Sequence, residues 1–97
     1  MNRQIYRAIN SKFILQFWYN GGTRTVEPFC YGIDLEGKEV LRGYQIKGYN
    51  ETGRAQEWKL FKVEKVMSLE ITNQHFTGER PRYSPKDPDM ETIFCCI

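Results

Sequence analysis

Cationic side chains alternate with apolar ones in three short blocks of the sequence, a pattern that could bind an anionic ligand. The blocks are residues 24–28 (RTVEP), 41–44 (LRGY) and 59–66 (KLFKVEKV). Successive side chains of a strand point to opposite faces, so each block could bury one face and present basic groups on the other. We therefore expect a charged binding surface on the strands of a small barrel.

Arg24 is the cation with the clearest local setting, because it lies two residues beyond a glycine turn on a stiff strand. A guanidinium held there is positioned for two-pronged contacts with a phosphate or a carboxylate. The alternative interpretation is a structural salt bridge to Glu27 or Glu64, since ion pairs of this kind are common.

Lys59, Lys62 and Lys65 lie in or just after one predicted strand. The alternation places Lys59 on the same face as Phe61 and opposite Lys62, so only some of these lysines can line one site. For any one of them, the other interpretation is a solubilising charge at a sheet edge or surface.

Aromatic side chains near these cations could stack on the bases of a single strand. The candidates are Tyr31, Tyr44, Tyr49 and Trp58. Burial in the core is the alternative for each, because so small a domain needs most of its aromatic residues there. Trp58 and Tyr49 flank a glycine-containing loop and are the two that we expect to be exposed.

The charge is local rather than global. The net charge is only +2, but residues 37–66 contain seven basic and four acidic residues, whereas residues 67–97 contain three basic and five acidic ones. A positive field is therefore expected around the central strands, not over the whole molecule.

Catalytic and metal-binding patterns do not emerge from the sequence. His75 has no serine or cysteine in a nucleophile arrangement, and neither a glycine-rich phosphate loop nor an HExxH motif occurs. Cys95 and Cys96 together with His75 lack the CxxC spacing of a zinc site. We expect a protein without enzymatic activity, bound metal or cofactor.

Three cysteines cannot all pair within the chain, and the adjacent Cys95 and Cys96 would bond to each other only with strain. Reduced thiols are the simplest expectation. The sequence has neither an apolar run of the roughly 20 residues that cross a bilayer nor a signal-peptide core. We therefore predict a cytoplasmic protein that does not bind membranes.

The elements that must position these residues form one domain over residues 1–97, with a core at 3–72 and an irregular C-terminal extension at 73–97. Ile5, Ala8 and Ile9 have helical spacing and predict a short N-terminal helix. Alternating patterns predict five strands, near residues 13–19, 23–33, 40–46, 57–63 and 67–72. The fold class is therefore mainly β.

Two further features concern turns and ends. Residues 20–22 (NGG) predict a tight hairpin, and Pro28 predicts an edge or a bulge in the second strand. At the C-terminal end, residues 87–89 (DPD) are a good helix start, whereas residues 92–97 (TIFCCI) favour a strand. We predict one or two helical turns followed by extended chain, and the conformation of residues 86–97 stays open.

The three blocks resemble the WYL domain of bacterial and phage regulators. That family has an R-x-V-x-P segment, a strand ending in L-x-G-Y or L-x-A-Y, and a later R-x-F-R-L-D-R-I segment. The matching stretches here are residues 24–28, 41–44 and 59–66, with lysines in place of the arginines of the third segment. The resemblance covers about residues 3–72.

Membership of this family would imply a five-stranded SH3-like (Sm-like) barrel that senses ligands. It would also imply binding of single-stranded nucleic acid or a nucleotide through Arg24, Lys59, Lys62 and Lys65, with Tyr44 beside them. The chain has no helix-turn-helix and is similar to small stand-alone members, which share the WKLF run and a loop like residues 78–81 (GERP). Accessory or modulatory roles in phage, mobile-element or defence systems are the expectation by analogy.

The sequence thus predicts a non-enzymatic regulatory module that binds single-stranded RNA or DNA, or a nucleotide. Its candidate site residues are Arg24, Arg42, Tyr44, Trp58, Lys59, Lys62 and Lys65. The alternative is a protein-interaction or oligomerisation module that buries an aromatic edge and the tail from Cys95 to Ile97 in an interface with a partner or a second copy.

Overall fold

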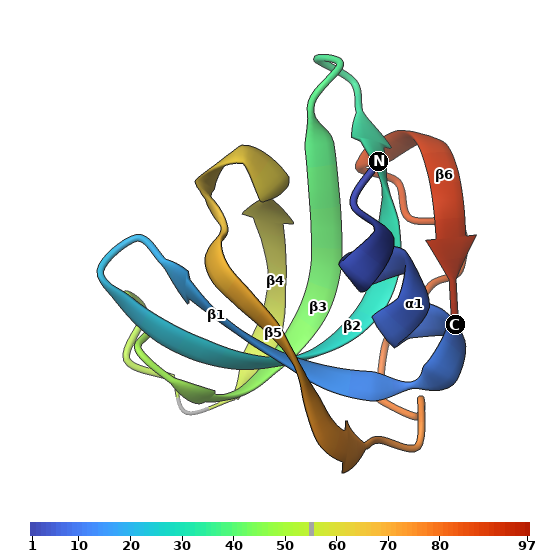
Figure 1. The fold of residues 1–97 in the computed structure, drawn as a ribbon. Helices are drawn as coiled ribbons and strands as arrows, with labels where there is room; N and C mark the ends of the chain where they lie inside the picture. The colour runs from blue at the N-terminus through green and yellow to red at the C-terminus, as the bar shows by residue number, and fades with distance from the viewer. Residues whose placement is uncertain (55) are drawn as a thin grey trace.

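The computed structural model describes residues 1–54 and 56–97 and is mainly β, with one short helix at the N-terminal end. The elements in chain order are α1 (Arg3–Ser11), β1 (Phe13–Tyr19), β2 (Gly22–Asp34), β3 (Glu39–Gly48), β4 (Glu57–Lys62), the 3₁₀ turn η1 (Val63–Lys65), β5 (Met67–His75) and β6 (Met90–Cys96) (Figure 1). The prediction of a mainly β fold with an N-terminal helix is confirmed.

The strands form one six-stranded antiparallel sheet in the order β4-β3-β2-β1-β5, with β6 paired to β2 outside this path. β4 and β5 lie at the two ends of the order, and no ladder joins them among the described residues. The sheet is therefore not closed into a barrel. The closed five-stranded barrel is the part of the fold prediction that the structure does not confirm, and a sixth strand is added.

β2 is the central strand, and two strands share one of its edges. β3 pairs with it from Arg24 to Ile33, whereas on the other edge β1 pairs up to Val26 and β6 begins at Cys30. Pro28 lies in the gap between these two partners and beside a register shift in the β3 ladder. A proline fits there because it has no N–H to leave unpaired. The predicted bulge is confirmed, but β2 is not an edge strand.

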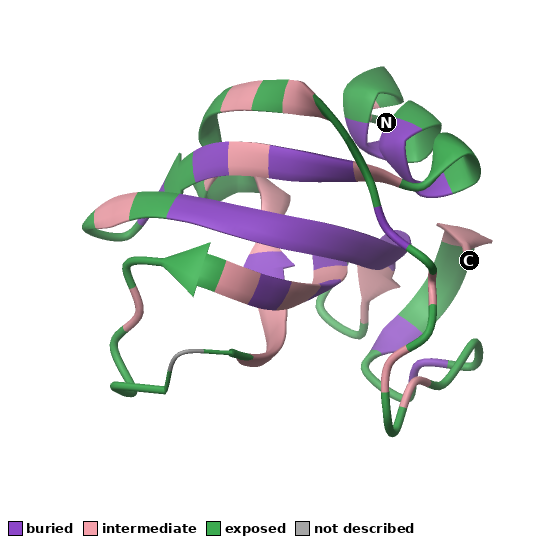
Figure 2. Ribbon diagram, turned by 90° about the horizontal axis from the view of Figure 1, so that it is seen from below, coloured by how far each residue is buried: buried purple, intermediate pink, exposed green. Residues whose placement is uncertain are grey.

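The helix α1 forms where the apolar spacing predicts it. The Asn2 side chain accepts a hydrogen bond from the Ile5 N–H at 3.0 Å, and the helix ends at Lys12, whose φ of 56° is left-handed. Ile5, Ala8 and Ile9 are buried on the side of the helix that faces the sheet (Figure 2). Within the described part of the chain, no helix is long and apolar enough to cross a membrane.

The hairpin between β1 and β2 uses the predicted turn. Asn20 and Gly21 both have positive φ and connect the paired residues Tyr19 and Gly22, which is the conformation that two-residue hairpin loops favour. The Tyr49 side chain packs on this turn so closely that a Cβ on Gly22 would lie 2.3 Å from the Cβ of Tyr49. Glycine is therefore required there for packing.

Apolar side chains cover both faces of the sheet. The inner core lies between α1 and the sheet, and its buried members are Ile5, Ala8, Ile9, Leu15, Phe17, Tyr19, Val26, Tyr31, Leu41 and Phe61. On the outer face, Ile14, Phe29 and Phe76 are buried against Tyr44, Trp58 and Tyr83. β2 is consequently buried along most of its length, as the continuous buried stretch in Figure 2 shows.

The C-terminal segment differs from the sequence prediction. Residues 90–96 form β6, and the expected helical turns do not form there. A single turn, in which the Met90 N–H donates to the Asp87 carbonyl at 3.1 Å, leads directly into the strand. The strand preference of Thr92, Ile93 and Phe94 prevails because the free edge of β2 offers hydrogen-bond partners.

Cys30 and Cys96 form a disulfide, which corrects the expectation of three reduced thiols. The two residues lie opposite each other in the β2–β6 ladder. Cys95 is the neighbouring strand residue and packs against the inner core instead, because side chains alternate along a strand. Its thiol is free. The expectation that Cys95 and Cys96 do not bond to each other is confirmed.

We predict that reduction of this disulfide destabilises the protein by about 4 kcal/mol, because the bridge spans 66 residues and restricts the unfolded chain. Urea unfolding followed by circular dichroism, with and without a reductant, measures the difference. Cys95→Ser is the matched control and should unfold like the unmodified oxidised protein. Alkylation of all three thiols in unreduced, denatured protein would contradict the assignment.

Candidate functional site

The candidate site residues lie on two faces of the sheet rather than on one. Cross-strand partners share a face, and β3 pairs with β4 so that Gly43 lies opposite Lys59 and Tyr44 opposite Trp58. The alternation places Arg42, Tyr44, Trp58 and Lys62 on the outer face. Arg24 and Lys59 are at the inner side instead, next to the loop that follows β3. The predicted single wall of cations is therefore divided.

Arg24 is almost fully buried, with 1% of its surface exposed. Its guanidinium donates to the Tyr19 carbonyl at 2.7 and 3.1 Å and to the side-chain oxygen of Gln45 at 3.3 Å, and it forms an ion pair with Glu51. The Tyr49 ring lies 5.2 Å from the guanidinium carbon. Arg24 thus holds the loop after β3 onto the β1–β2 hairpin.

This arrangement corrects the expectation that Arg24 faces solvent, and it supports the alternative of a structural salt bridge. The partner is Glu51 rather than Glu27 or Glu64. The hydrogen bond from Arg24 lowers the pKa of Glu51, and the positive charges of Arg24 and Lys59 act in the same direction, against partial desolvation. The Lys59 ammonium lies 4.0 Å from Glu51 and 3.7 Å from Glu57.

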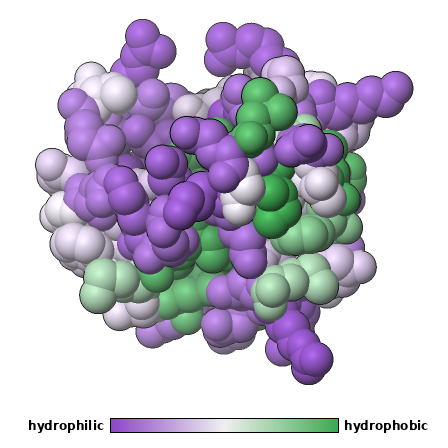
Figure 3. Space-filling view, turned by 90° about the horizontal axis from the view of Figure 1, so that it is seen from above, coloured by the Kyte–Doolittle hydropathy of each residue, from purple (hydrophilic) through white to green (hydrophobic). Residues whose placement is uncertain are grey.

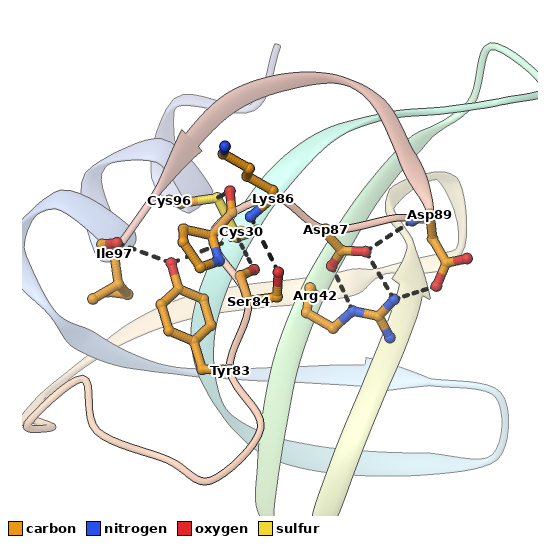
Figure 4. Close-up of a disulfide and its surroundings, with 10 residues drawn as sticks. Cys30, Arg42, Tyr83, Ser84, Lys86, Asp87, Asp89, Cys96 and Ile97 are labelled. Carbon is orange, nitrogen blue, oxygen red and sulfur yellow. Dashed lines mark hydrogen bonds and ion pairs between the residues drawn. A yellow bond between two sulfur atoms is a disulfide. The ribbon is translucent and has the colours of Figure 1, made fainter.

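On the outer face, Arg42 is bound by two acids from the C-terminal segment. Its Nε and Nη2 donate to the two carboxylate oxygens of Asp87 at 2.7 and 3.1 Å, and Nη2 also pairs with Asp89 (Figure 4). The Asp87 side chain is 4% exposed. Burial disfavours its charged form, but the hydrogen bonds from Arg42 and from the Asp89 N–H outweigh burial and lower the pKa of Asp87.

A second bidentate pair joins the C-terminal segment to the sheet. Arg80 donates to the two carboxylate oxygens of the buried Glu27 at 2.8 and 3.0 Å. The Arg80 guanidinium carbon also lies 4.3 Å from the centre of the Tyr44 ring. Arg80 thereby covers one side of the Tyr44 ring. In this structure Tyr44 supports Arg80, whereas the sequence predicts a position beside the ligand.

Trp58 lies at the centre of an aromatic cluster. Its ring is 4.8 Å from Phe29 and 5.3 Å from Tyr44 in edge contacts, and it stacks on Tyr83 at 6.2 Å with 19° between the planes. The indole N–H donates to the Pro81 carbonyl at 2.9 Å.

The two aromatic residues that were expected from the sequence to be exposed differ in burial. Trp58 is half-buried, whereas Tyr49 is exposed as expected.

Beside this cluster is a pocket of about 390 Å³, which we call the outer pocket. It is open to solvent and combines three guanidinium groups with two aromatic rings, a serine, a proline and two acids. The residues that line it are Arg42, Arg54, Glu57, Trp58, Arg82, Tyr83, Ser84, Asp87 and Pro88. Of the candidates from the sequence, Arg42 and Trp58 line this pocket.

Arg54 and Arg82 are the cations that sequence reasoning did not select. Both are exposed, and neither forms an ion pair within residues 1–54 and 56–97. Arg82 has a left-handed φ of 65° in a turn whose Tyr83 N–H donates to the Arg80 carbonyl. The sequence signal that could have identified Arg82 is its place in the basic, proline-containing stretch 78–85.

Lys62 and Lys65 lie at the far end of β4, away from the outer pocket. Lys62 is the last residue of the strand, and Lys65 is exposed at the end of η1. Within the described residues, neither lysine forms an ion pair, whereas the neighbouring Glu64 pairs with Lys38 at 3.9 Å. Both lysines are therefore available to an anion that extends along β4.

The described side chains contain no group of three or more residues that could hold a metal ion. His75 lies on the exposed end of β5, with its Nδ1 3.2 Å from the Ser11 carbonyl and its ring against Phe13. These contacts tie β5 to the end of α1.

No protein-family model matches the chain, and neither a curated protein nor a solved structure matches it.

We predict that the Arg42–Asp87 pair stabilises the protein above pH ~4 and loses this effect as the pH falls further. The pKa of Asp87 is lowered in the folded state relative to about 3.9 in an unfolded chain, so protonation favours unfolding. Asp87→Asn should cost about 1–3 kcal/mol at pH 7 and progressively less in acid. Urea unfolding at several pH values measures it, and a difference that is independent of pH would contradict the assignment.

Proposed function

We propose that the protein is a non-enzymatic module that binds single-stranded nucleic acid or a nucleotide in the outer pocket. The observation that carries this proposal is the meeting of Arg54 and Arg82, both exposed, with the rings of Trp58 and Tyr83 in one pocket of about 390 Å³. Guanidinium groups bind phosphate in a bidentate manner, and aromatic rings stack on bases of any sequence.

The pocket is suited to one nucleotide unit at a time. Pockets for small ligands usually enclose about 300–1,000 Å³ and combine apolar walls with a few placed polar groups. Here the wall of Trp58, Tyr83 and Pro88 would receive the base, and Arg54 and Arg82 would bind the phosphate. Arg42 would not bind the phosphate, because the carboxylates of Asp87 and Asp89 already hold and neutralise its guanidinium.

The two acids in the pocket do not prevent an anion from approaching. Asp87 is neutralised by Arg42, and Glu57 lies 3.7 Å from the Lys59 ammonium and accepts a hydrogen bond from Thr52. In a longer strand, further phosphates would follow the outer side of β4 towards Lys62 and Lys65. Arg24 and Lys59 would support the loop beside the pocket and not contact the ligand.

The WYL resemblance is part of this proposal and supplies its regulatory context. The order of the first five strands, with β5 beside β1, supports a relation to a five-stranded SH3-like (Sm-like) barrel, although the sheet itself is not closed and β6 is added. An accessory role in phage, mobile-element or defence systems is proposed on the same basis. A cytoplasmic location remains a prediction.

A protein-interaction role is the second candidate, because Trp18 and Met67 are cross-strand partners that are 41% and 58% exposed. Figure 3 also shows apolar side chains gathered on one face and bordered by hydrophilic ones, an arrangement that can mark an interface. From the sequence, the tail from Cys95 to Ile97 was expected to be buried in such an interface. The tail instead packs within the fold through β6 and does not support this candidate.

We predict that the double variant Arg54→Ala/Arg82→Ala binds a fluorescein-labelled single-stranded oligonucleotide at least roughly tenfold more weakly, because each phosphate contact adds to affinity. It should also lower the slope of log affinity against log salt by about 1 to 2. Fluorescence anisotropy at several salt concentrations measures both quantities.

The matched control for this experiment is Arg3→Ala/Arg7→Ala, which removes the same charge from α1 and should bind nearly as well as the unmodified protein. Equal losses in the two double variants would indicate a non-specific charge effect and contradict the assigned site. A stable oligomer by light scattering, with no oligonucleotide binding at low salt, would favour the protein-interaction role instead.

A further inference from the structure

The Cys30–Cys96 disulfide lies directly behind one wall of the outer pocket. The Cys30 sulfur is 3.8 Å from the Tyr83 hydroxyl and 3.9 Å from the Ser84 carbonyl oxygen, and the Cys96 sulfur is 3.6 Å from the Pro85 carbonyl oxygen. Tyr83 and Ser84 line the pocket. Figure 4 shows the bridge and this wall side by side. A change at the bridge therefore reaches the pocket through direct contacts.

A second connection runs through the end of the chain. The Tyr83 hydroxyl donates to the Ile97 carbonyl at 2.9 Å, and the Ile97 N–H donates to the Phe29 carbonyl at 2.9 Å. Ile97 directly follows Cys96, so the bridge fixes the acceptor that orients the Tyr83 ring. Without the bridge, only the last hydrogen bonds between β6 and β2 would hold the Ile97 carbonyl in place.

We propose that the Cys30–Cys96 disulfide is a redox switch that sets the ligand affinity of the outer pocket, with high affinity in the oxidised state and low affinity in the reduced state. This inference rests on the proposed binding function and adds its regulation. The reductant is a cellular dithiol, and an oxidised dithiol would restore the bridge.

The chemistry of the switch is thiol–disulfide exchange. A thiolate of the dithiol attacks the Cys96 sulfur, because Cys96 is partly exposed whereas Cys30 is fully buried. The Cys30 sulfur leaves as a thiolate and takes a proton. The second thiol of the reductant then displaces Cys96 from the mixed disulfide. Two electrons pass to the protein, which gains two thiols while the dithiol becomes a disulfide.

The third cysteine does not interfere with this exchange. Cys95 packs on the inner face, and burial raises the pKa of its thiol to about 11. The thiol is therefore protonated near neutral pH and is a poor nucleophile towards the adjacent bridge. The switch has two defined states rather than a mixture of shuffled disulfides.

Other contacts keep the C-terminal segment on the sheet when the bridge opens. The pairs Arg42–Asp87 and Arg80–Glu27 and the bond from Trp58 to the Pro81 carbonyl do not involve either cysteine of the bridge. Reduction is therefore expected to loosen residues 83–86, between these anchors, while the rest of the sheet stays folded. A wall that is ordered for a smaller fraction of the time binds ligand proportionally more weakly.

The test measures binding of a fluorescein-labelled oligothymidine strand with and without dithiothreitol. Reduction should raise the dissociation constant roughly tenfold in the unmodified protein, as expected if the wall is competent about one tenth of the time. Cys95→Ser is the matched control and should respond in the same way. Cys96→Ser cannot form the bridge and should bind weakly under both conditions.

A ligand-free readout separates this inference from the proposed function. In a Trp18→Phe background, reduction should change the fluorescence of Trp58 and increase hydrogen exchange in residues 83–86. If no oligonucleotide binds, the proposed function fails, and the exchange measurement still decides whether the bridge controls the pocket wall. Unchanged exchange on reduction, or loss of the whole far-ultraviolet circular dichroism signal, would overturn the switch, since the latter would make the bridge a global staple.

Discussion

The structure depends on β2, whose backbone must be hydrogen-bonded along both edges because both of its faces are buried. β3 pairs with one edge from Arg24 to Ile33, but the other edge is divided between β1 and β6. Pro28 marks the division. The first half of β2 therefore belongs to a local hairpin, whereas the second half recruits the end of the chain from more than 60 residues away, as the Cys30–Cys96 separation of 66 shows. That recruitment carries the segment before β6 over the outer face and creates the pocket.

The ion pairs follow from the same arrangement. The sequence is basic in its middle and acidic in its tail, and the fold brings these two regions together so that Asp87 and Asp89 neutralise Arg42. Arg24 is neutralised on the opposite side by Glu51. The Arg42–Asp87 pair is the bidentate one of these, and breaking it would leave an uncompensated charge on the buried Asp87. The cations that remain for an external anion are those whose neighbours supply no acid, and Arg54 and Arg82 are the pair that the pocket brings together.

Local patterns predicted the parts of this fold that depend on neighbouring residues. The spacing of Ile5, Ala8 and Ile9 located α1, the Asn-Gly-Gly turn located the first hairpin, and alternation located the first five strands. Alternation placed Lys59 and Lys62 on opposite faces, but it did not show which face other segments of the chain would cover. Arg24 was therefore expected in solvent, whereas a loop buries it. β6, the disulfide and the wall of the pocket depend on long-range pairing, which residue spacing does not encode.

We infer that the segment before β6 and the outer face of β3 and β4 form one ligand site around Trp58. Two-dimensional ¹H–¹⁵N NMR of the two tryptophan indole groups tests it directly during titration with a single-stranded oligonucleotide. Trp58 lines the pocket and donates its indole N–H to the Pro81 carbonyl, whereas Trp18 lies on β1 and is 41% exposed. We expect the oligonucleotide to shift the Trp58 indole signal progressively and to leave the Trp18 signal unchanged. A shift of Trp18 alone, or of neither signal, would contradict it.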